Sequence, residues 1–210
     1  PPRSTLFPYT TLFRSIALNQ ALAQSCDVYF YDVARRIGVD AIAAMAERFG
    51  LGHELGIDVP GERPGLIPTR AWKKAAVGES WQKGETLVAG IGQGFVLATP
   101  LQLAIMTARL CNGGMAVRPW LVEPEAGALA GIEPIGVSPQ ALRAVQAGMH
   151  EVINGRRGTA RKARLDIEGV EMAGKTGTSQ VRRISRTERA AGAHKRKDRP
   201  WEERDHALFV

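Results

Sequence analysis

The sequence predicts a mixed α/β domain, on the basis of two observations about its periodicity. From Ile16 to Asn154, apolar residues recur at helical spacing and are interrupted by turn residues. Further along, the period changes, and residues 170–181 and 207–210 indicate two strands joined by a charged segment. Helices followed by strands are typical of mixed α/β or α+β domains, and no internal repeat is visible.

Each predicted helix begins or ends at a residue that favours a helix start or a helix end. Hydroxyl side chains followed by proline are strong helix starts, and glycine or asparagine commonly follows a helix end. Residues 51–68 are rich in glycine and proline and are predicted as a loop. The predicted helices run from Ile16 to Ser25, on from there to Gly38, from a cap at Asp40 to Gly50, over a short stretch after Thr69, from Thr99-Pro100 to Asn112, and from Ser138-Pro139 to Asn154.

The composition is that of a folded protein with one domain or a piece of a larger one. The chain has 210 residues, of which 44% are apolar and 23% charged, so it can bury a core. The apolar stretch 87–110 is interrupted by polar residues and a proline, which argues against a membrane span there. Cys26 and Cys111 are expected as free buried thiols. The spacing of cysteines and histidines predicts no metal site, and no cofactor is expected.

The positive charge is concentrated in one segment. The formal net charge is +7, and residues 182–199 contain eight basic and two acidic side chains, a surplus of six. The rest of the chain is therefore close to neutral. Because this segment has no aromatic side chain on which a base stacks, we interpret it as a solvated loop and expect no nucleic-acid partner.

Residues 169–176 match the phosphate-loop pattern GxxxxGK[ST]. In such a loop a helix begins at the lysine, and its N-terminal amides bind phosphate. Here Val170 and Met172 have strand character, and Gly177 is a poor residue for a helix start. Nucleotide binding therefore stays as a minor alternative, which depends on whether a helix follows Lys175.

The same lysine begins Lys175-Thr176-Gly177-Thr178, which predicts a strand that binds a carboxylate. On this interpretation the lysine and both hydroxyls occupy alternate positions on one face, and Gly177 leaves the backbone open to a ligand. A cluster of this kind suits an acyl-transfer site. The simpler alternative is a solvent-facing edge strand.

A second polar pair, Ser25 and Asp27, lies at the junction of the first two predicted helices. Both side chains are placed to reach a common cleft with the lysine, although Ser25 and Lys175 are 150 residues apart in the chain. The simpler alternative is that they cap the helices, which is what serine and aspartate do most often at such positions.

Four motifs, in this order, resemble the transpeptidase domain of class B penicillin-binding proteins. They are SCD (25–27), GIGQGFVLATPLQLA (90–104), NGRRGTA (154–160) and KTGT (175–178). Three further stretches are similar to the elongation-type members, penicillin-binding protein 2, namely 25–38, 56–69 and 200–210. The resemblance covers residues 16–210 and implies the penicillin-binding, serine β-lactamase-like fold.

The resemblance implies a serine D,D-transpeptidase that cross-links peptidoglycan during cell elongation. In such enzymes a serine attacks the D-Ala-D-Ala bond of one stem peptide, D-Ala leaves, and an amino group of a second stem peptide accepts the acyl group. The implied partners are stem peptides, β-lactam antibiotics and a membrane glycan polymerase. The implied location is the periplasmic face of the bacterial inner membrane. A non-catalytic domain of the same fold is the alternative.

The resemblance also assigns roles to the predicted site. Ser25 is expected to relay protons or to hold the catalytic lysine, and Asp27, where many relatives have asparagine, to orient the network. Lys175 is expected to bind the donor carboxylate together with the hydroxyls of Thr176 and Thr178. The backbone N–H of Thr178 is expected to form half of an oxyanion hole.

The nucleophile of the family is expected to be absent from the chain. In the family it lies in an SxxK motif upstream of SxD, whereas the SxxK present here, Ser80 to Lys83, follows SxD and is bounded by glycines. That setting is a poor helix start, so we expect Ser80 to be a loop residue. The chain by itself is then expected to be inactive.

Both ends of the chain are expected to be interrupted. Residues 5–15, TLFPYTTLFRS, resemble codon by codon the translation of a common sequencing adapter, so we interpret residues 1–15 as not native. Residues 207–210 end inside an apolar, strand-like run. The domain over 16–210 is therefore expected to be partial, without the upstream SxxK segment and the last strands.

Overall fold

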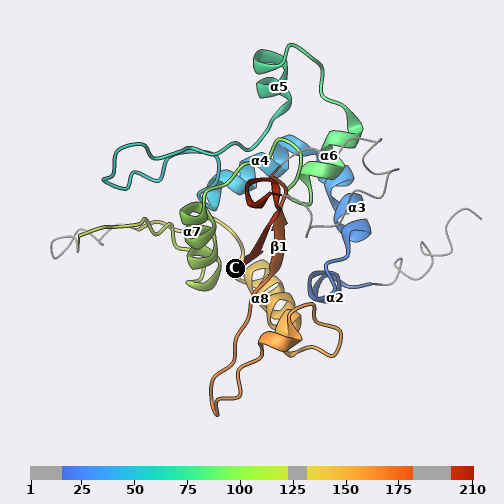
Figure 1. Cartoon of the computed structure of the whole chain (residues 1–210), viewed down its shortest axis with the longest axis vertical. Helices are drawn as coiled ribbons and strands as arrows, with labels where there is room; N and C mark the ends of the chain where they lie inside the picture. Colours follow the sequence, from blue (N-terminus) through green and yellow to red (C-terminus); the bar gives the residue numbers. More distant parts are fainter. Residues whose placement is uncertain (1–15, 123–131, 182–199) are drawn as a thin grey trace, which may run out of the picture.

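The computed structural model describes residues 16–122, 132–181 and 200–210 (Figure 1). The expectations for residues 1–15 and for the basic segment 182–199 lie outside the described residues. The elements follow the predicted order, with helices first and then a two-stranded antiparallel sheet. The predicted mixture of helices and strands is therefore confirmed.

The first three helices are α2 (Leu18–Ala23), α3 (Asp27–Ile37) and α4 (Val39–Arg48). As predicted, the junction between the first two contains Ser25. The expected cap by Asp40 is wrong, because α4 already begins at Val39 and has no side-chain cap. The Asp40 carboxylate instead accepts hydrogen bonds from the backbone N of Arg70 at 3.0 Å and from its Nε at 2.5 Å. It therefore ties α4 to the start of the next helix.

Helix α5 (Arg70–Ala76) is the predicted short helix, and its cap is confirmed because the Thr69 hydroxyl accepts from the backbone N of Trp72 at 2.9 Å. Helix α6 (Lys83–Ala89) is not among the predicted helices. Its first turn is closed by Glu85, whose carboxylate accepts from the backbone N of Gln82 at 2.7 Å. That glutamate was the available signal for the helix start.

A buried lysine joins these two helices. Lys73 on α5 is 1% exposed, and its Nζ lies 2.6 Å from Glu85 Oε1 on α6 and donates to the Ser80 carbonyl at 3.2 Å. The hydrogen bond with Glu85 raises the pKa of Lys73 above its ordinary value. The charged pair therefore holds together the two ends of the loop between α5 and α6.

Helices α7 (Pro100–Cys111) and α8 (Pro139–Asn154) begin as predicted. Thr99 accepts from the backbone N of Gln102 at 3.1 Å, and Ser138 accepts from the backbone N of Ala141 at 3.2 Å. Gln102 has a second role that its position in the first turn does not reveal. Its buried amide donates to the His53 and Pro64 carbonyls at 2.8 and 2.9 Å, which fixes the predicted loop over 51–68 against α7.

The sheet consists of β1 (Thr176–Ser179) and β2 (His206–Phe209), in a register that pairs Thr176 with Phe209 and Thr178 with Ala207. A strand, not a helix, follows Lys175, which excludes the nucleotide-binding alternative. The strand character expected at Val170 and Met172 is wrong. The Met172 carbonyl is bound by the Asn154 side-chain amide at 2.9 Å, at the end of α8.

The helical core is centred on α8. Leu142 and Met149 on this helix pack with Leu110 of α7 in the buried hydrophobic cluster. Helices α2 and α8 lie side by side beneath the sheet in Figure 1. Their approach is very close, because a Cβ at Gly148 of α8 would lie 2.4 Å from Leu22 Cδ1 and 3.3 Å from the Asn19 Cα. Glycine is therefore required there by packing.

Both cysteines are free in the described structure, but only Cys26 is buried. The expected burial of Cys111 is wrong, because this last residue of α7 lies exposed at the helix end. None of the helices in the described parts of the chain is long and apolar enough to cross a membrane.

The close contact of α2 and α8 gives a first prediction. Gly148→Ala is expected to lower the free energy of unfolding by about 1–3 kcal/mol, because overpacking outweighs the better helix propensity of alanine. The matched control is Gly84→Ala in α6, where nothing lies within 4 Å of the added Cβ. That variant is expected to be neutral or more stable by up to about 1 kcal/mol. Urea unfolding followed by circular dichroism measures both, and an unchanged stability of Gly148→Ala would contradict the packing argument.

Candidate active site

The turn between α2 and α3 presents the Ser25 side chain. The backbone N of Ser25 donates to the Leu22 carbonyl at 3.2 Å, and that of Cys26 donates to the Ala21 carbonyl at 2.9 Å. Ser25 has a φ of +50°, the one positive value of a non-glycine residue in the described parts of the chain. This left-handed conformation costs a side-chain-bearing residue about 1 kcal/mol. Ser25 therefore occupies a strained position that the turn imposes.

The simpler interpretation of Ser25 and Asp27 as helix caps is wrong. The N-cap of α3 is Cys26, with no side-chain hydrogen bond to the helix, and the C-cap of α2 is Gln24. Asp27 is the first residue of α3 and is exposed. The hydroxyl of Ser25 and the carboxylate of Asp27 are thus available to the space beyond the helix ends.

The backbone around Lys175 is fixed from two sides. The backbone N of Gly174 donates to the Met149 carbonyl of α8 at 3.1 Å, and that of Lys175 donates to the Val210 carbonyl at 2.7 Å. A Cβ at Gly174 would lie 2.6 Å from the Val210 carbonyl oxygen and 2.2 Å from Phe209 Cζ, so the close passage of the backbone here requires glycine. These hydrogen bonds fix the position of the Lys175 backbone, and therefore the point from which its side chain extends.

The Lys175 ammonium meets Ser25 across the molecule. Lys175 Nζ donates to Ser25 Oγ at 2.6 Å, to the Thr176 carbonyl at 2.8 Å and more weakly to Thr176 Oγ1 at 3.4 Å. The structure therefore joins two motifs that are 150 positions apart in the sequence. Lys175 and Ser25 are the predicted pair for which the structure provides a direct contact.

Burial lowers the pKa of Lys175 below its ordinary value of 10.5, and the charge of Asp27 acts in the opposite direction. Burial, followed by the same carboxylate, raises the pKa of Tyr31 on α3. Asp27 thus acts on the cluster through its charge, and no hydrogen bond joins its carboxylate to Lys175 within the described residues. Partial burial therefore makes the Lys175 ammonium easier to deprotonate than an exposed lysine.

The strand distributes the remaining predicted residues differently from expectation. Strand alternation places Thr176 and Thr178 on one face and Lys175 out of phase with them. The long lysine side chain nevertheless reaches Thr176 Oγ1. Lys175 Nζ makes no hydrogen bond to Thr178 in the described part of the chain. The expected single face is therefore correct for the two hydroxyls and wrong for the lysine.

The backbone of β1 is open on the side away from β2. Lys175 and Val210 exchange two hydrogen bonds, so the antiparallel pattern directs the N–H groups of Thr176 and Thr178 away from β2. A Cβ at Gly177 would meet only Leu208 Cβ, at 3.5 Å, which is an ordinary contact. The chain itself thus gives no packing reason for glycine at 177, and the exposed backbone is free to receive a ligand.

One further residue of the cluster, Thr159, was missed in the sequence. Its Oγ1 lies 3.1 Å from Thr176 Oγ1, and its backbone N donates to the Ala23 carbonyl at 3.0 Å. Thr159 belongs to the NGRRGTA stretch (154–160), one of the motifs that resemble the transpeptidase family. Nothing in its spacing from the other motifs indicated a contact with them.

Ser80, the serine of the misplaced SxxK, lies outside this cluster. It is exposed and precedes α6, so Ser80 and Lys83 do not share a helical turn. Its hydrogen bond in the described structure is through the carbonyl, which accepts from Lys73 and from the Gln82 amide. Ser80 is therefore a loop residue, as expected.

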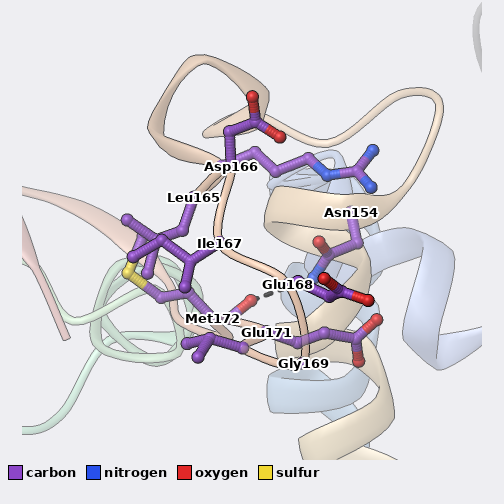
Figure 2. Close-up of a pocket in the computed structure, with 10 residues that line it drawn as sticks. Asn154, Leu165, Asp166, Ile167, Glu168, Gly169, Glu171 and Met172 are labelled. Atoms are coloured by element: carbon purple, nitrogen blue, oxygen red, sulfur yellow. Dashed lines mark hydrogen bonds between the residues drawn. The ribbon is translucent and has the colours of Figure 1, made fainter.

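A cavity of about 580 Å³ lies beside the end of α8, and Figure 2 shows its lining. It is formed by Asn154 and residues 164–172, and the Asn154 amide reaches the Met172 carbonyl across its base. None of the residues around Lys175 lines it. The predicted site residues and this cavity are thus in different places. No group of potential metal ligands is found among the described residues.

The opposing effects on Lys175 give a prediction. Asp27→Asn is expected to lower the pKa of Lys175 further, because the carboxylate that raises it is removed. The pKa is measured by NMR titration of ¹³Cε-labelled lysine, with Lys175→Arg for assignment. Asp32→Asn on the same helix is the control, since Asp32 pairs with Arg35 and Arg36, and should leave Lys175 unchanged. Identical titrations of Asp27→Asn and the wild type would refute the electrostatic link.

The strained serine gives a second prediction. Ser25→Ala is expected to reduce the free energy of unfolding by about 1–3 kcal/mol, since the Lys175 ammonium loses an acceptor. Ser25→Gly loses the same hydroxyl but relieves the left-handed backbone, so it should be about 1 kcal/mol more stable than Ser25→Ala. Chemical denaturation compares the two. The opposite order would show that the φ of Ser25 is not strained.

A family model for the penicillin binding protein transpeptidase domain matches residues 8–196. Among curated proteins, the peptidoglycan D,D-transpeptidase MrdA of Haemophilus influenzae is 38% identical over 203 residues. MrdA of Escherichia coli K12 is 34% identical over 201 residues. Each match covers 92% of this chain and 30% or 31% of the relative. The chain thus spans about a third of the length of these relatives.

Solved structures show the same similarity. The crystal structure of Pseudomonas aeruginosa PBP2 in complex with WCK 5153 has a TM-score of 0.73 and 38% identity, covering 93% of this chain and 40% of that one. The complex between PBP2 and MreC from Helicobacter pylori has a TM-score of 0.74 and 30% identity, covering 92% and 33%. The predicted fold class is confirmed, and the chain belongs to the penicillin binding protein transpeptidase domain family, where it is similar to the PBP2 (MrdA) proteins.

Proposed function

We propose that this chain supplies the carboxylate-binding half of a peptidoglycan D,D-transpeptidase active site. The observation that carries the proposal is the hydrogen bond of 2.6 Å between Lys175 Nζ and Ser25 Oγ, which brings the SxD and KTGT motifs together. The names of the relatives support the reaction class. The reaction is acyl transfer: a serine oxygen attacks the D-Ala-D-Ala peptide carbonyl, D-Ala leaves, and an amino group of a second stem peptide takes the acyl group.

The donor carboxylate binds beside Lys175, whose charge is the strongest attraction available to an anion in the cluster. The hydroxyls of Thr176 and Thr178 share one face of β1 and add hydrogen bonds to that carboxylate. The open backbone at Gly177 lets the peptide lie along the strand. The Thr178 N–H, directed away from β2, donates to the oxyanion that forms on the attacked carbonyl.

Ser25 and Asp27 adjust the lysine. The Ser25 hydroxyl accepts from Lys175 and fixes the position of the ammonium. It has its own proton to donate, so it also provides a path for proton transfer to the leaving amine. Asp27 opposes the effect of burial on the lysine pKa and so helps to keep the group charged for carboxylate binding.

The nucleophile, in this proposal, belongs to a part of the protein outside these 210 residues. Ser80 lies in a loop, and its hydrogen bonds in the described structure are to Lys73 and Gln82 and not to the Lys175 cluster, so we do not assign it as the nucleophile. Residues 1–15 are proposed not to be native, and residues 16–210 to be a partial domain. The match of the family model from residue 8 onward overlaps the end of that first stretch.

The partners follow from the same proposal. Solved relatives include PBP2 in complex with WCK 5153 and with MreC, and a peptidoglycan synthase complex described by its coordination of polymerization and crosslinking. By analogy we assign to the whole protein β-lactams as inhibitors, stem peptides as substrates and a membrane glycan polymerase as partner. Its catalytic domain is placed on the periplasmic face of the bacterial inner membrane.

Covalent labelling with a fluorescent penicillin tests the proposal. The 210-residue chain is expected to show no mass shift, whereas the full-length product of the gene is expected to take up one penicillin on a serine outside residues 16–210. Lys175→Gln in the full-length protein should slow labelling about 100-fold, because the ligand carboxylate loses its charged partner. Lys162→Gln, an exposed lysine of the short η1 turn (Arg161–Ala163), is the matched control and should label normally.

Two other labelling results would contradict parts of the proposal. A labelled Ser80 would reverse its assignment as a loop residue. A full-length protein that takes up no penicillin would overturn the catalytic proposal and favour a non-catalytic domain of the same fold.

A further inference from the structure

Thr159 occupies a turn whose backbone is held from several sides. The turn follows α8, where the backbone N of Gly158 donates to the Gly155 carbonyl at 3.1 Å and that of Ala160 to the Val152 carbonyl at 3.0 Å. A Cβ at Gly158 would lie 2.2 Å from the Val152 carbonyl oxygen. The turn is therefore pressed against the end of the helix. Thr159 follows this close passage and is exposed on the side of the site.

From this position Thr159 contacts both halves of the site. Its backbone N donates to the carbonyl of Ala23, two residues before Ser25, at 3.0 Å. Its hydroxyl oxygen lies 3.1 Å from Thr176 Oγ1 on β1. The backbone bond fixes the residue relative to the Ser25 turn, and the hydroxyl is then presented to the strand that follows Lys175. The backbone bond does not depend on the side chain, so the two contacts can be separated by mutation.

The geometry points to Thr159 as a positioning residue that directs the hydroxyl hydrogen of Thr176 toward the substrate carboxylate. A threonine hydroxyl has one hydrogen to donate and two lone pairs to accept with. At Thr176 Oγ1, Lys175 Nζ approaches one lone pair at 3.4 Å. Donation from the Thr159 hydroxyl occupies the other. The hydrogen of Thr176 is then left for a third partner, which is the carboxylate that Lys175 attracts.

The inference rests on the proposed function, because it assigns a ligand carboxylate to the Lys175 cluster. It adds that the ligand is recognised through a chain of hydrogen bonds from Thr159 to Thr176 to the carboxylate. In such a chain each bond polarises the next, so the hydroxyl of Thr176 becomes a better donor to an anion. A purely structural role for Thr159 would affect charged and uncharged ligands alike, which makes the two roles distinguishable.

The test uses the full-length gene product and two ligands, a penicillin with its free carboxylate and the methyl ester of the same penicillin. Thr159→Val keeps the shape and the backbone bond to Ala23 but removes the hydroxyl. It is expected to lower the second-order acylation constant for the free acid about tenfold, with less than a twofold change for the ester. Thr159→Ser restores a hydroxyl and is expected to recover most of the loss.

The matched control is Thr107→Val in α7. The hydroxyl of Thr107 donates to the Leu103 carbonyl within its own helix at 2.8 Å, and no hydrogen bond joins it to Ser25, Lys175 or Thr176 in the described structure. This variant reports the effect of losing one threonine hydroxyl in general, and it should acylate as the wild type does with both ligands.

Three results would overturn the inference. Equal losses for acid and ester in Thr159→Val would indicate a structural role, and unchanged acylation of both would indicate no role. Either result leaves the proposed function intact, because the wild type is still acylated. A wild type that reacts with neither compound would overturn the proposed function and, with it, the assignment of Thr159.

Discussion

The hydrogen bond between Lys175 Nζ and Ser25 Oγ is the contact on which the rest of the site depends. Its two partners come from opposite ends of the described chain, from a helix junction and from the start of a strand. A lysine in a partly buried position needs an acceptor, and the serine hydroxyl supplies one. The φ of +50° at Ser25 is the cost of presenting that hydroxyl. The strained backbone of Ser25 and the hydrogen bond of its side chain to Lys175 therefore occur together in this candidate site.

Close backbone approaches at glycine make this contact possible. Gly148 lets α2 and α8 approach, which places the Ser25 turn, and Gly174 lets the chain pass Phe209 into β1, which places Lys175. The backbone N of Gly174 donates to the Met149 carbonyl, so α8 contacts both the segment that precedes Lys175 and the helix that precedes Ser25. Helix α8 therefore positions the SxD and KTGT motifs relative to each other. Larger side chains at these positions would separate them before any functional group was changed.

Elements with local signals were predictable. Hydroxyl caps followed by proline at Thr99 and Ser138 specify a helix start within a few residues, and the structure has both helices there. Helix α6 was not predicted, because the glycines at 78 and 84 make this stretch a poor helix start by propensity, whereas the structure closes its first turn with Glu85. The predicted cap at Asp40 is wrong, because its carboxylate accepts a hydrogen bond from Arg70, 30 positions away. Such errors arise where a side chain that suits a local role has a distant partner instead.

The sequence by itself determined the family, the order of the motifs, most of the helices and the residue types of the site, because these depend on short-range patterns. Only the tertiary structure decided how the residues meet. It placed Lys175 against Ser25, separated Lys175 from the face shared by Thr176 and Thr178, and brought Thr159 to Thr176. Contacts of this kind depend on the packing of α2, α8 and the sheet, and no spacing rule within one segment contains that information.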